Sequence, residues 1–147
     1  MHPLRTIATA ATLTAALLTS PCIVSAQTAA PAGSPCDQAY AAKRWNDVVD
    51  TCAGVADSAG HQVSTPAGSD LSQEDRMALY ASLITSTLHL ASAYLELGDS
   101  RMADVNLQKA GLWLQLAQSQ GLSSDSAEYK ALQSEIQRTQ AALGPQP

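Results

Sequence analysis

Few side chains of this 147-residue chain have the chemistry to catalyse a reaction or to bind a metal ion. Beyond its first 26 residues the chain holds two histidines, His61 and His89, and two cysteines, Cys36 and Cys52. If the two cysteines form a disulfide they offer no thiolate, and two histidines alone do not complete the ligand set of a zinc site. The sequence therefore predicts neither a metal site nor a cofactor.

The two histidines also give little support for catalysis. His89 falls in an apolar run of a predicted helix, where a histidine that packs or faces a groove is expected more often than a catalytic base. His61 lies in a predicted loop; Asp57 and Asp70 could orient it, but no motif marks a nucleophile beside it. We predict that the protein is not an enzyme. The alternative is an enzyme, or an enzyme subunit, that uses His61 or His89.

The net negative charge of the chain disfavours partners that are themselves negatively charged. The formal net charge is -5 and the isoelectric point is about 4.9, so the chain lacks the basic field that attracts nucleic acid or an anionic membrane. The sequence has no glycine-rich phosphate loop and no calcium-loop spacing of acidic residues. We interpret Asp47, Asp50 and Asp57 as a solvated helix face. No nucleic-acid partner is predicted.

The first 26 residues resemble an export signal in their order of charge and hydropathy. Arg5 precedes an uncharged stretch over residues 7–18, and small residues lead to a cleavage site after Ala26. The apolar stretch is shorter than the roughly 20 residues of a membrane-spanning helix, so we predict no stable membrane insertion after cleavage. Cys22 raises the alternative of a lipid-modified cysteine, but Pro21 disfavours it. We expect an exported protein, either periplasmic or secreted.

In an oxidising compartment the remaining cysteines are expected to pair. Cys36 and Cys52 lie equally far from residue 44, where two short helical patterns are broken. If those helices fold back on each other, both cysteines reach the same height, so residues 36–58 are predicted to form a disulfide-stapled hairpin. The alternative is two separate buried thiols that behave as small apolar residues.

Composition predicts an all-α fold of antiparallel helical hairpins. Phe is absent and aromatic residues make up only 4% of the chain, whereas Ala and Leu, which favour helices, are abundant. Proline and glycine then divide the chain into segments. The predicted segments are a flexible leader over 27–35, the hairpin over 36–58, a loop over 58–70, a three-helix part over 72–143 and a tail over 144–147, giving about five helices.

The strongest helical pattern runs from residue 72 to about residue 97. Ser72 and Asp75 approximate a capping box at its start, and Gly98 follows its end. Apolar residues occupy two faces of this helix, which predicts burial between neighbours on both sides. The next helix is expected to end near Gly121, and the last to start after a cap within Ser123–Ser126.

The segment Ala93–Asp99 reads Ala-Tyr-Leu-Glu-Leu-Gly-Asp, and Ala103 follows it. This run resembles a tetratricopeptide repeat, in which a tyrosine, a Leu-Gly turn and small residues let two antiparallel helices pack closely. Ala39-Tyr40 and Lys43-Arg44-Trp45 look like an earlier, degenerate copy. The resemblance implies that residues 36–143 form a single domain of about two repeats with a C-terminal capping helix. The alternative is an irregular five-helix bundle.

The resemblance also implies a ligand groove on the first helix of each repeat. Carried over to this chain, the groove residues are Thr85, Leu88, Ser92, Leu95 and Glu96. They include no Lys, Arg or Asn that would clamp a carboxylate, so a peptide held by apolar and hydroxyl contacts is favoured. The alternative for Leu88 and Leu95 is packing in the core.

Together these features favour an exported, non-enzymatic adaptor or scaffold that binds a protein or peptide. Trp113 is predicted either to lie in the seam against the last helix or to serve as an exposed anchor for that partner. The alternative function is a helical carrier that holds a small molecule or a lipid in a cavity lined by Ala and Leu.

Overall fold

A computed structural model describes residues 33–65, 68 and 70–144 of the chain. The predicted signal peptide and residues 27–32 of the predicted leader lie outside the described residues. The described part contains no β-strand, which confirms the all-α prediction. Its five helices are α1 (Pro35–Ala41), α2 (Trp45–Ser64), α3 (Gln73–Glu96), α4 (Ser100–Ser119) and α5 (Ala127–Leu143).

Helix α1 begins within the segment predicted as a leader. The Ser34 hydroxyl accepts a hydrogen bond from the backbone N–H of Asp37, and the Asp37 carboxylate accepts one from the backbone N–H of Ser34. Pro35 occupies the first turn, where its missing N–H costs nothing. This reciprocal cap starts the helix just before Cys36.

The loop predicted over 58–70 is wrong in its first half, because α2 continues to Ser64. Gly60 lies inside this helix, where it allows close approach of neighbouring side chains. A Cβ added at Gly60 would lie 3.8 Å from Leu83 and 4.0 Å from Trp113. Packing of α2 on α3 outweighs the weak helix propensity of this segment.

Helix α3 is central and buried on two sides, as its two apolar faces predicted. One face joins a core cluster with α4 and α5 that includes Ile84 and Leu88. The opposite face joins a second cluster with α1 and α2 that includes Leu90 and Ala93. Gly98, with a φ of 82°, follows the end of α3 in the left-handed region that glycine adopts without strain.

The remaining helix boundaries also agree with the sequence. Asp99 accepts a hydrogen bond from the backbone N–H of Met102 and caps α4, and Gly121 follows its end with a φ of 112°. Ser126 accepts from the backbone N–H of Tyr129 and caps α5. The predicted C-terminal tail has only Gly144 within the described residues.

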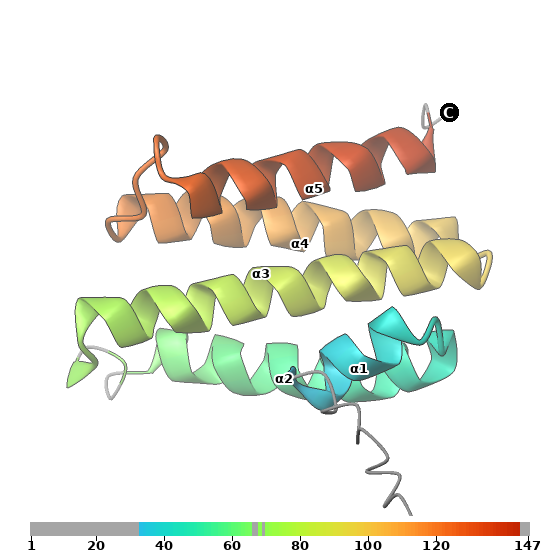
Figure 1. The fold of residues 1–147 in the computed structure, drawn as a ribbon, viewed down its shortest axis with the longest axis horizontal. Helices are drawn as coiled ribbons and strands as arrows, with labels where there is room; N and C mark the ends of the chain where they lie inside the picture. The colour runs from blue at the N-terminus through green and yellow to red at the C-terminus, as the bar shows by residue number, and fades with distance from the viewer. Residues whose placement is uncertain (1–32, 66–67, 69, 145–147) are drawn as a thin grey trace, which may run out of the picture. The chain divides into compact units, whose positions relative to one another are not determined.

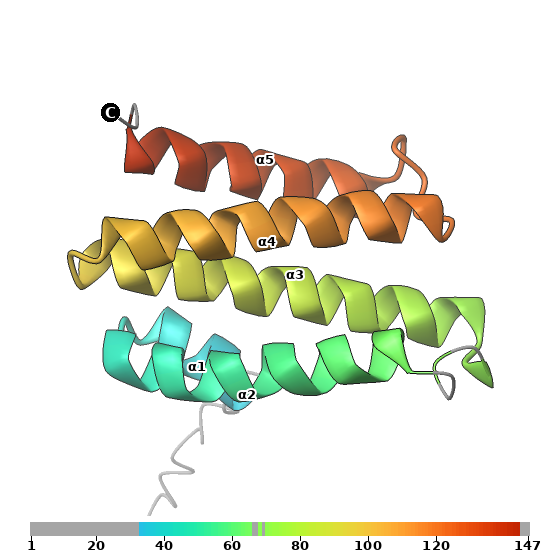
Figure 2. The ribbon, with the colours of Figure 1, turned by 180° about the vertical axis from the view of Figure 1, so that it is seen from behind.

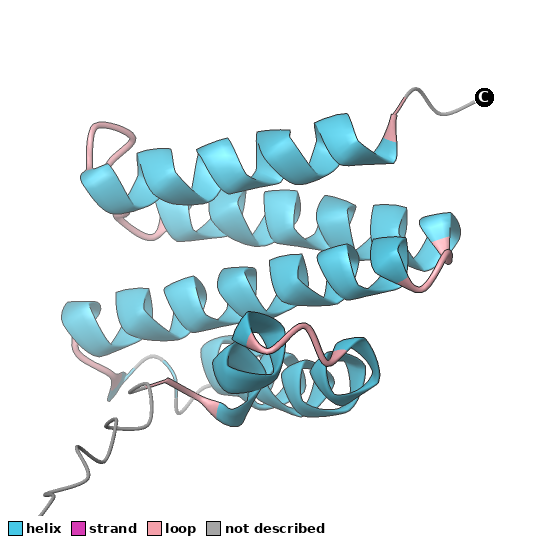
Figure 3. Ribbon diagram, turned by 45° about the vertical axis from the view of Figure 1, so that its right-hand side comes forward, coloured by secondary structure: helices cyan, strands magenta, loops and turns pink. Residues whose placement is uncertain are grey.

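Figures 1 and 2 show α2, α3, α4 and α5 side by side in this order, each antiparallel to the one before. Helix α1 packs against both α2 and α3, and Figure 3 shows it turned back beside the start of α2. Helix α3 is packed against all four other helices. Within the described ranges, no helix combines the length and the apolar character needed to cross a membrane.

Candidate functional site

The structure divides the predicted groove residues between the core and the surface. Leu88 has no exposed surface and belongs to the core, so its assignment to a groove is wrong and the packing alternative holds. Thr85 is half-buried. Ser92, Leu95 and Glu96 do line a common depression, which we call the α3–α5 cleft.

The α3–α5 cleft is small and mixed in polarity. Its volume is about 230 Å³. The hairpin contributes Tyr40 and Trp45, whose rings meet edge to face with centroids 5.9 Å apart. Helix α5 contributes one carboxylate, Glu135, and one guanidinium, Arg138. This cleft can contact a polar group, but it offers little apolar surface to a ligand.

A larger depression lies on the opposite side of α3, between α2 and α4, and we call it the α2–α4 groove. Its volume is about 620 Å³. Its floor is formed by α3, one wall by α2 and the other by α4. The lining residues are Leu83, Thr87, Leu90 and Tyr94 from α3, Ala53, Ala56, Asp57, Gly60 and Ser64 from α2, and Met102, Asn106, Lys109, Leu112, Trp113 and Leu116 from α4.

The α4 wall exposes large apolar side chains to water. Leu112 is 64% exposed, Leu116 40% and Met102 36%. Trp113, predicted to lie either in a seam against the last helix or as an exposed anchor, is half-buried: it packs against the core cluster shared by α3, α4 and α5 and lies beside Gly60 of α2 in the groove lining. Apolar surface gathered in one concave groove is typical of a site where a protein segment or a ligand binds.

Two polar side chains of the α2–α4 groove, Thr87 on the floor and Asn106 on the α4 wall, hydrogen-bond to the backbone of their own helices. The Thr87 hydroxyl donates to the Leu83 carbonyl at 2.6 Å, and the Asn106 amide donates to the Met102 carbonyl at 2.8 Å. One acidic residue, Asp57, stands on the α2 wall, and one basic residue, Lys109, stands on the α4 wall. The groove therefore presents an apolar floor between two walls of opposite charge.

The sequence did contain a signal for this groove. Leu112, Leu116 and Met102 fall outside the regular apolar stripe of α4, which includes Leu107 and Leu114 in the core. Large apolar residues that a helix does not need for its core are candidates for a binding surface. The apolar pattern of α4 alone did not show what these residues face, because part of the opposite wall, Gly60 and Ser64, lies in the segment that was predicted as a loop.

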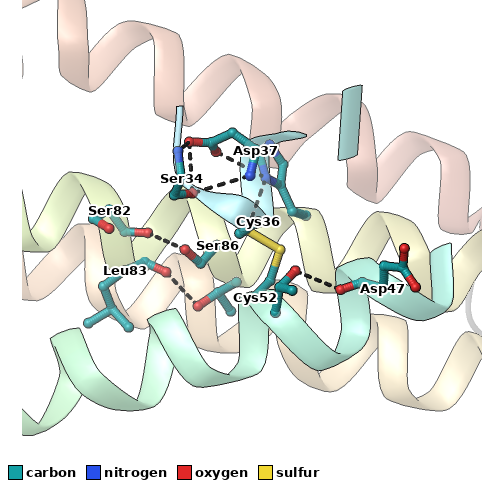
Figure 4. Close-up of a disulfide and its surroundings, with 11 residues drawn as sticks. Ser34, Cys36, Asp37, Asp47, Cys52, Ser82, Leu83 and Ser86 are labelled. Atoms are coloured by element: carbon teal, nitrogen blue, oxygen red, sulfur yellow. Dashed lines mark hydrogen bonds and ion pairs between the residues drawn. A yellow bond between two sulfur atoms is a disulfide. The ribbon is translucent and has the colours of Figure 1, made fainter. Parts of the chain in front are cut away.

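A second group of titratable and sulfur-containing side chains lies where α1 meets α2 and α3. A disulfide joins Cys36 to Cys52, as predicted, and Figure 4 shows it linking α1 to α2 beside the cap formed by Ser34 and Asp37. His89 of α3 is 7% exposed. Its Nδ1 lies 3.6 Å from the Cys36 Sγ and 3.7 Å from Asp37 Oδ1.

His89 is packed against neighbouring side chains in the core. It stacks on Tyr40 with ring centroids 3.7 Å apart and an interplanar angle of 10°. Burial lowers the pKa of His89 below its usual value, while the carboxylates of Glu135 and Asp37 partly oppose that shift. Sequence reasoning placed His89 in a packed position but did not bring it to the disulfide. His61, by contrast, lies in α2 and is exposed.

No protein-family model, no curated protein and no solved structure matches this chain.

Proposed function

We propose that this chain is an exported, non-enzymatic helical-repeat protein, similar to tetratricopeptide-repeat proteins, that binds an apolar segment of another protein in the α2–α4 groove. The observation that carries the proposal is the groove itself, with about 620 Å³ of space and an α4 wall on which Leu112 is 64% exposed. The cleft on the opposite side of α3 has about 230 Å³ and charged walls, and it supports the proposal less well.

The form of the groove favours an amphipathic helix as the bound segment. Helices α2 and α4, which run in the same direction on either side of α3, leave a groove along the helix axes that accepts side chains spaced at three and four residues along a partner helix. Trp113 and Tyr94 supply aromatic surface, which contributes strongly to binding energy at protein interfaces. Asp57 and Lys109 face a partner from opposite walls and can orient its charges.

Export remains part of the proposal. The N-terminal 26 residues have the composition of a signal peptide, and the disulfide is of the kind that persists in an oxidising compartment. The proposed working place is therefore the periplasm or the cell exterior. There the protein would serve as an adaptor or scaffold.

Site-specific cross-linking in the exported fraction of the host tests the groove. A photo-reactive amino acid in place of Leu112 should cross-link to one reproducible protein partner. The matched control carries the same amino acid in place of Leu97, which is 45% exposed but lies outside the α2–α4 groove. Equal yields at the two positions would contradict the proposed site.

A second measurement separates loss of binding from loss of folding. Leu112→Gln combined with Leu116→Gln changes only exposed side chains, so the helix content in circular dichroism should stay unchanged. The same variant should lose the partner, whereas Leu97→Gln should retain it. A double variant that keeps full binding would overturn the proposal.

The groove also favours one second candidate, a carrier of an apolar small molecule or lipid. Its volume lies within the roughly 300–1,000 Å³ range of ligand pockets, and aromatic and aliphatic side chains predominate in its lining. Native mass spectrometry of the protein isolated from its host distinguishes the candidates. A reproducible added small-molecule mass, lost in the Leu112→Gln, Leu116→Gln variant, supports the carrier. A mass equal to that of the chain alone counts against it.

A further inference from the structure

Three side chains with metal-ligating atoms meet in the core beside α1. Cys36, Cys52 and His89 are all buried, and their potential ligand atoms lie within 4.8 Å of one another. They come from three different helices that pack together, so the fold holds them in place independently of any ion. In the disulfide form the sulfurs are bonded to each other and are not available as thiolates.

The spacing of these groups suits a tetrahedral metal ion. Zinc–sulfur and zinc–nitrogen bonds of about 2.3 and 2.0 Å, at tetrahedral angles, place a thiolate and an imidazole nitrogen about 3.5 Å apart. The Cys36 Sγ and the His89 Nδ1 are already 3.6 Å apart. Once the S–S bond is broken, the sulfurs are free to separate to the about 3.8 Å that two thiolates of one zinc site need.

The carboxylate of Asp37 lies beside these three groups and is the candidate for a fourth ligand. Asp37 Oδ1 lies 3.7 Å from the His89 Nδ1. Its other oxygen, Oδ2, accepts hydrogen bonds from the backbone N–H and the hydroxyl of Ser34, at 3.0 and 2.9 Å, which fix the orientation of the carboxylate. Asp37 is partly exposed, so an ion can reach this corner from solvent.

We propose that reduction of the Cys36–Cys52 disulfide turns this corner into a zinc site formed by Cys36, Cys52, His89 and Asp37. A thiol reductant supplies two electrons and two protons, is itself oxidised to a disulfide, and leaves two protein thiols. Binding of one Zn²⁺ then releases both thiol protons to solvent and forms two zinc–sulfur bonds, one zinc–nitrogen bond and one zinc–oxygen bond.

The ligand set selects zinc over softer and harder ions. Two thiolates and an imidazole disfavour Mg²⁺ and Ca²⁺, which prefer oxygen ligands. The carboxylate disfavours Cu⁺, which prefers soft ligands. Four ligands from the protein leave no open coordination position, so the bound ion would be structural rather than catalytic. The site thus gives the α1 corner two alternative cross-links, a disulfide when oxidised and a metal ion when reduced.

Co²⁺ titration of the full chain, isolated from its exporting host, tests the site. After reduction with a phosphine and removal of excess reagent, the chain should bind one Co²⁺ with thiolate charge-transfer absorption and the visible bands of tetrahedral cobalt. Zn²⁺ should displace it with a dissociation constant on the order of nanomolar or below. The oxidised chain should show neither signal. A reduced chain without the cobalt bands would overturn the proposal.

Variants identify the ligands. Cys52→Ser should reduce the thiolate charge-transfer absorption by at least about half, since one of the two thiolates is lost, and His89→Gln should weaken Zn²⁺ binding by at least about 100-fold. His61→Gln is the matched control and should bind as the unmodified chain does, because His61 is exposed on α2. Unchanged binding in the His89 variant would overturn the proposal.

Asp37→Asn provides a second test in case the His89 variant fails to fold. Asp37 is partly exposed, so its replacement leaves the buried ligands in place. The visible cobalt bands of this variant should shift and its Zn²⁺ affinity should fall by at least about tenfold. An unchanged spectrum and affinity would exclude the carboxylate and overturn the four-ligand site.

Discussion

Leu88 and Leu112 are leucines on neighbouring long helices, but Leu88 has no exposed surface and Leu112 is 64% exposed. We expect Leu88→Ala to lower the free energy of unfolding by about 2–5 kcal/mol, because it leaves a cavity between α3 and α4. Leu112→Ala should change it by less than about 0.5 kcal/mol. Urea denaturation followed by circular dichroism measures both. Similar losses in the two variants would contradict the assignment of Leu88 to the core.

His89 is predicted to make the fold less stable in acid. Because burial lowers its pKa in the native state, the unfolded chain, with a histidine pKa of about 6.5, binds the proton more readily than the native chain. The contribution of His89 is therefore complete above pH 6.5 and is lost as the pH falls below that value, although Asp37 and Glu135 moderate the loss. The slope is at most about 1.4 kcal/mol per pH unit.

The comparison of native His89 with His89→Gln isolates this effect. Urea unfolding at pH 8, 7, 6 and 5 should show a smaller loss of stability toward acid in the variant, since the variant lacks the buried imidazole that must gain a proton. His61→Gln controls for the removal of a histidine as such, because His61 is exposed. Parallel pH profiles for the native chain and His89→Gln would disprove the prediction.

At the scale of the elements, α1 has only seven residues and depends on its cross-link. The disulfide closes a sequence separation of 16 residues, which by chain entropy is worth about 3 kcal/mol. Cys36→Ala combined with Cys52→Ala should therefore lower the free energy of unfolding by about that amount. Hydrogen exchange should rise first in α1, because a helix this short does not persist alone. Equal acceleration in α5, which lies beyond the hairpin, would contradict a local role.

The glycine in the turn between α3 and α4 is predicted to matter more for stability than a glycine inside a helix. Gly98→Ala should cost about 1 kcal/mol, because Gly98 has a φ of 82°, which alanine adopts only with strain. Gly111→Ala is the matched control: Gly111 lies inside α4, and an added Cβ meets no atom within 4 Å. That change should raise stability by up to about 1 kcal/mol. Thermal denaturation should show a lower melting temperature for Gly98→Ala and a higher one for Gly111→Ala. Shifts of the same sign in both variants would contradict the prediction.

For the whole described domain, α3 connects two core clusters, since Leu90 faces the hairpin while Leu88 faces α4 and α5. We expect one cooperative unfolding transition, because neither cluster survives the loss of α3. Trp45→Phe leaves Trp113 as a reporter beside α4, and Trp113→Phe leaves Trp45 as a reporter beside the hairpin. In both variants the fluorescence midpoint should match the circular dichroism midpoint. Separate midpoints would show that the two clusters unfold independently.

The sequence by itself determined the elements that depend on local chemistry. The caps at Ser72 and Ser126 and the glycines after α3 and α4 mark helix boundaries through interactions within a few residues. The pairing of Cys36 with Cys52 followed because only two cysteines remained beyond the predicted signal peptide. The two apolar faces of α3 likewise predicted a central helix, because apolar residues recur at helical spacing on both faces and each such face needs a neighbour to cover it.

Only the tertiary structure decided what depends on contacts between distant segments. It extended α2 through Gly60, because packing on Leu83 and Trp113 outweighs local propensity. It buried Leu88 and opened the α2–α4 groove on the opposite face of α3, since a helix apolar on two sides does not reveal which side is fully covered. It also brought His89 to the disulfide, although 53 residues separate His89 from Cys36 along the chain. Such contacts form only when helices pack.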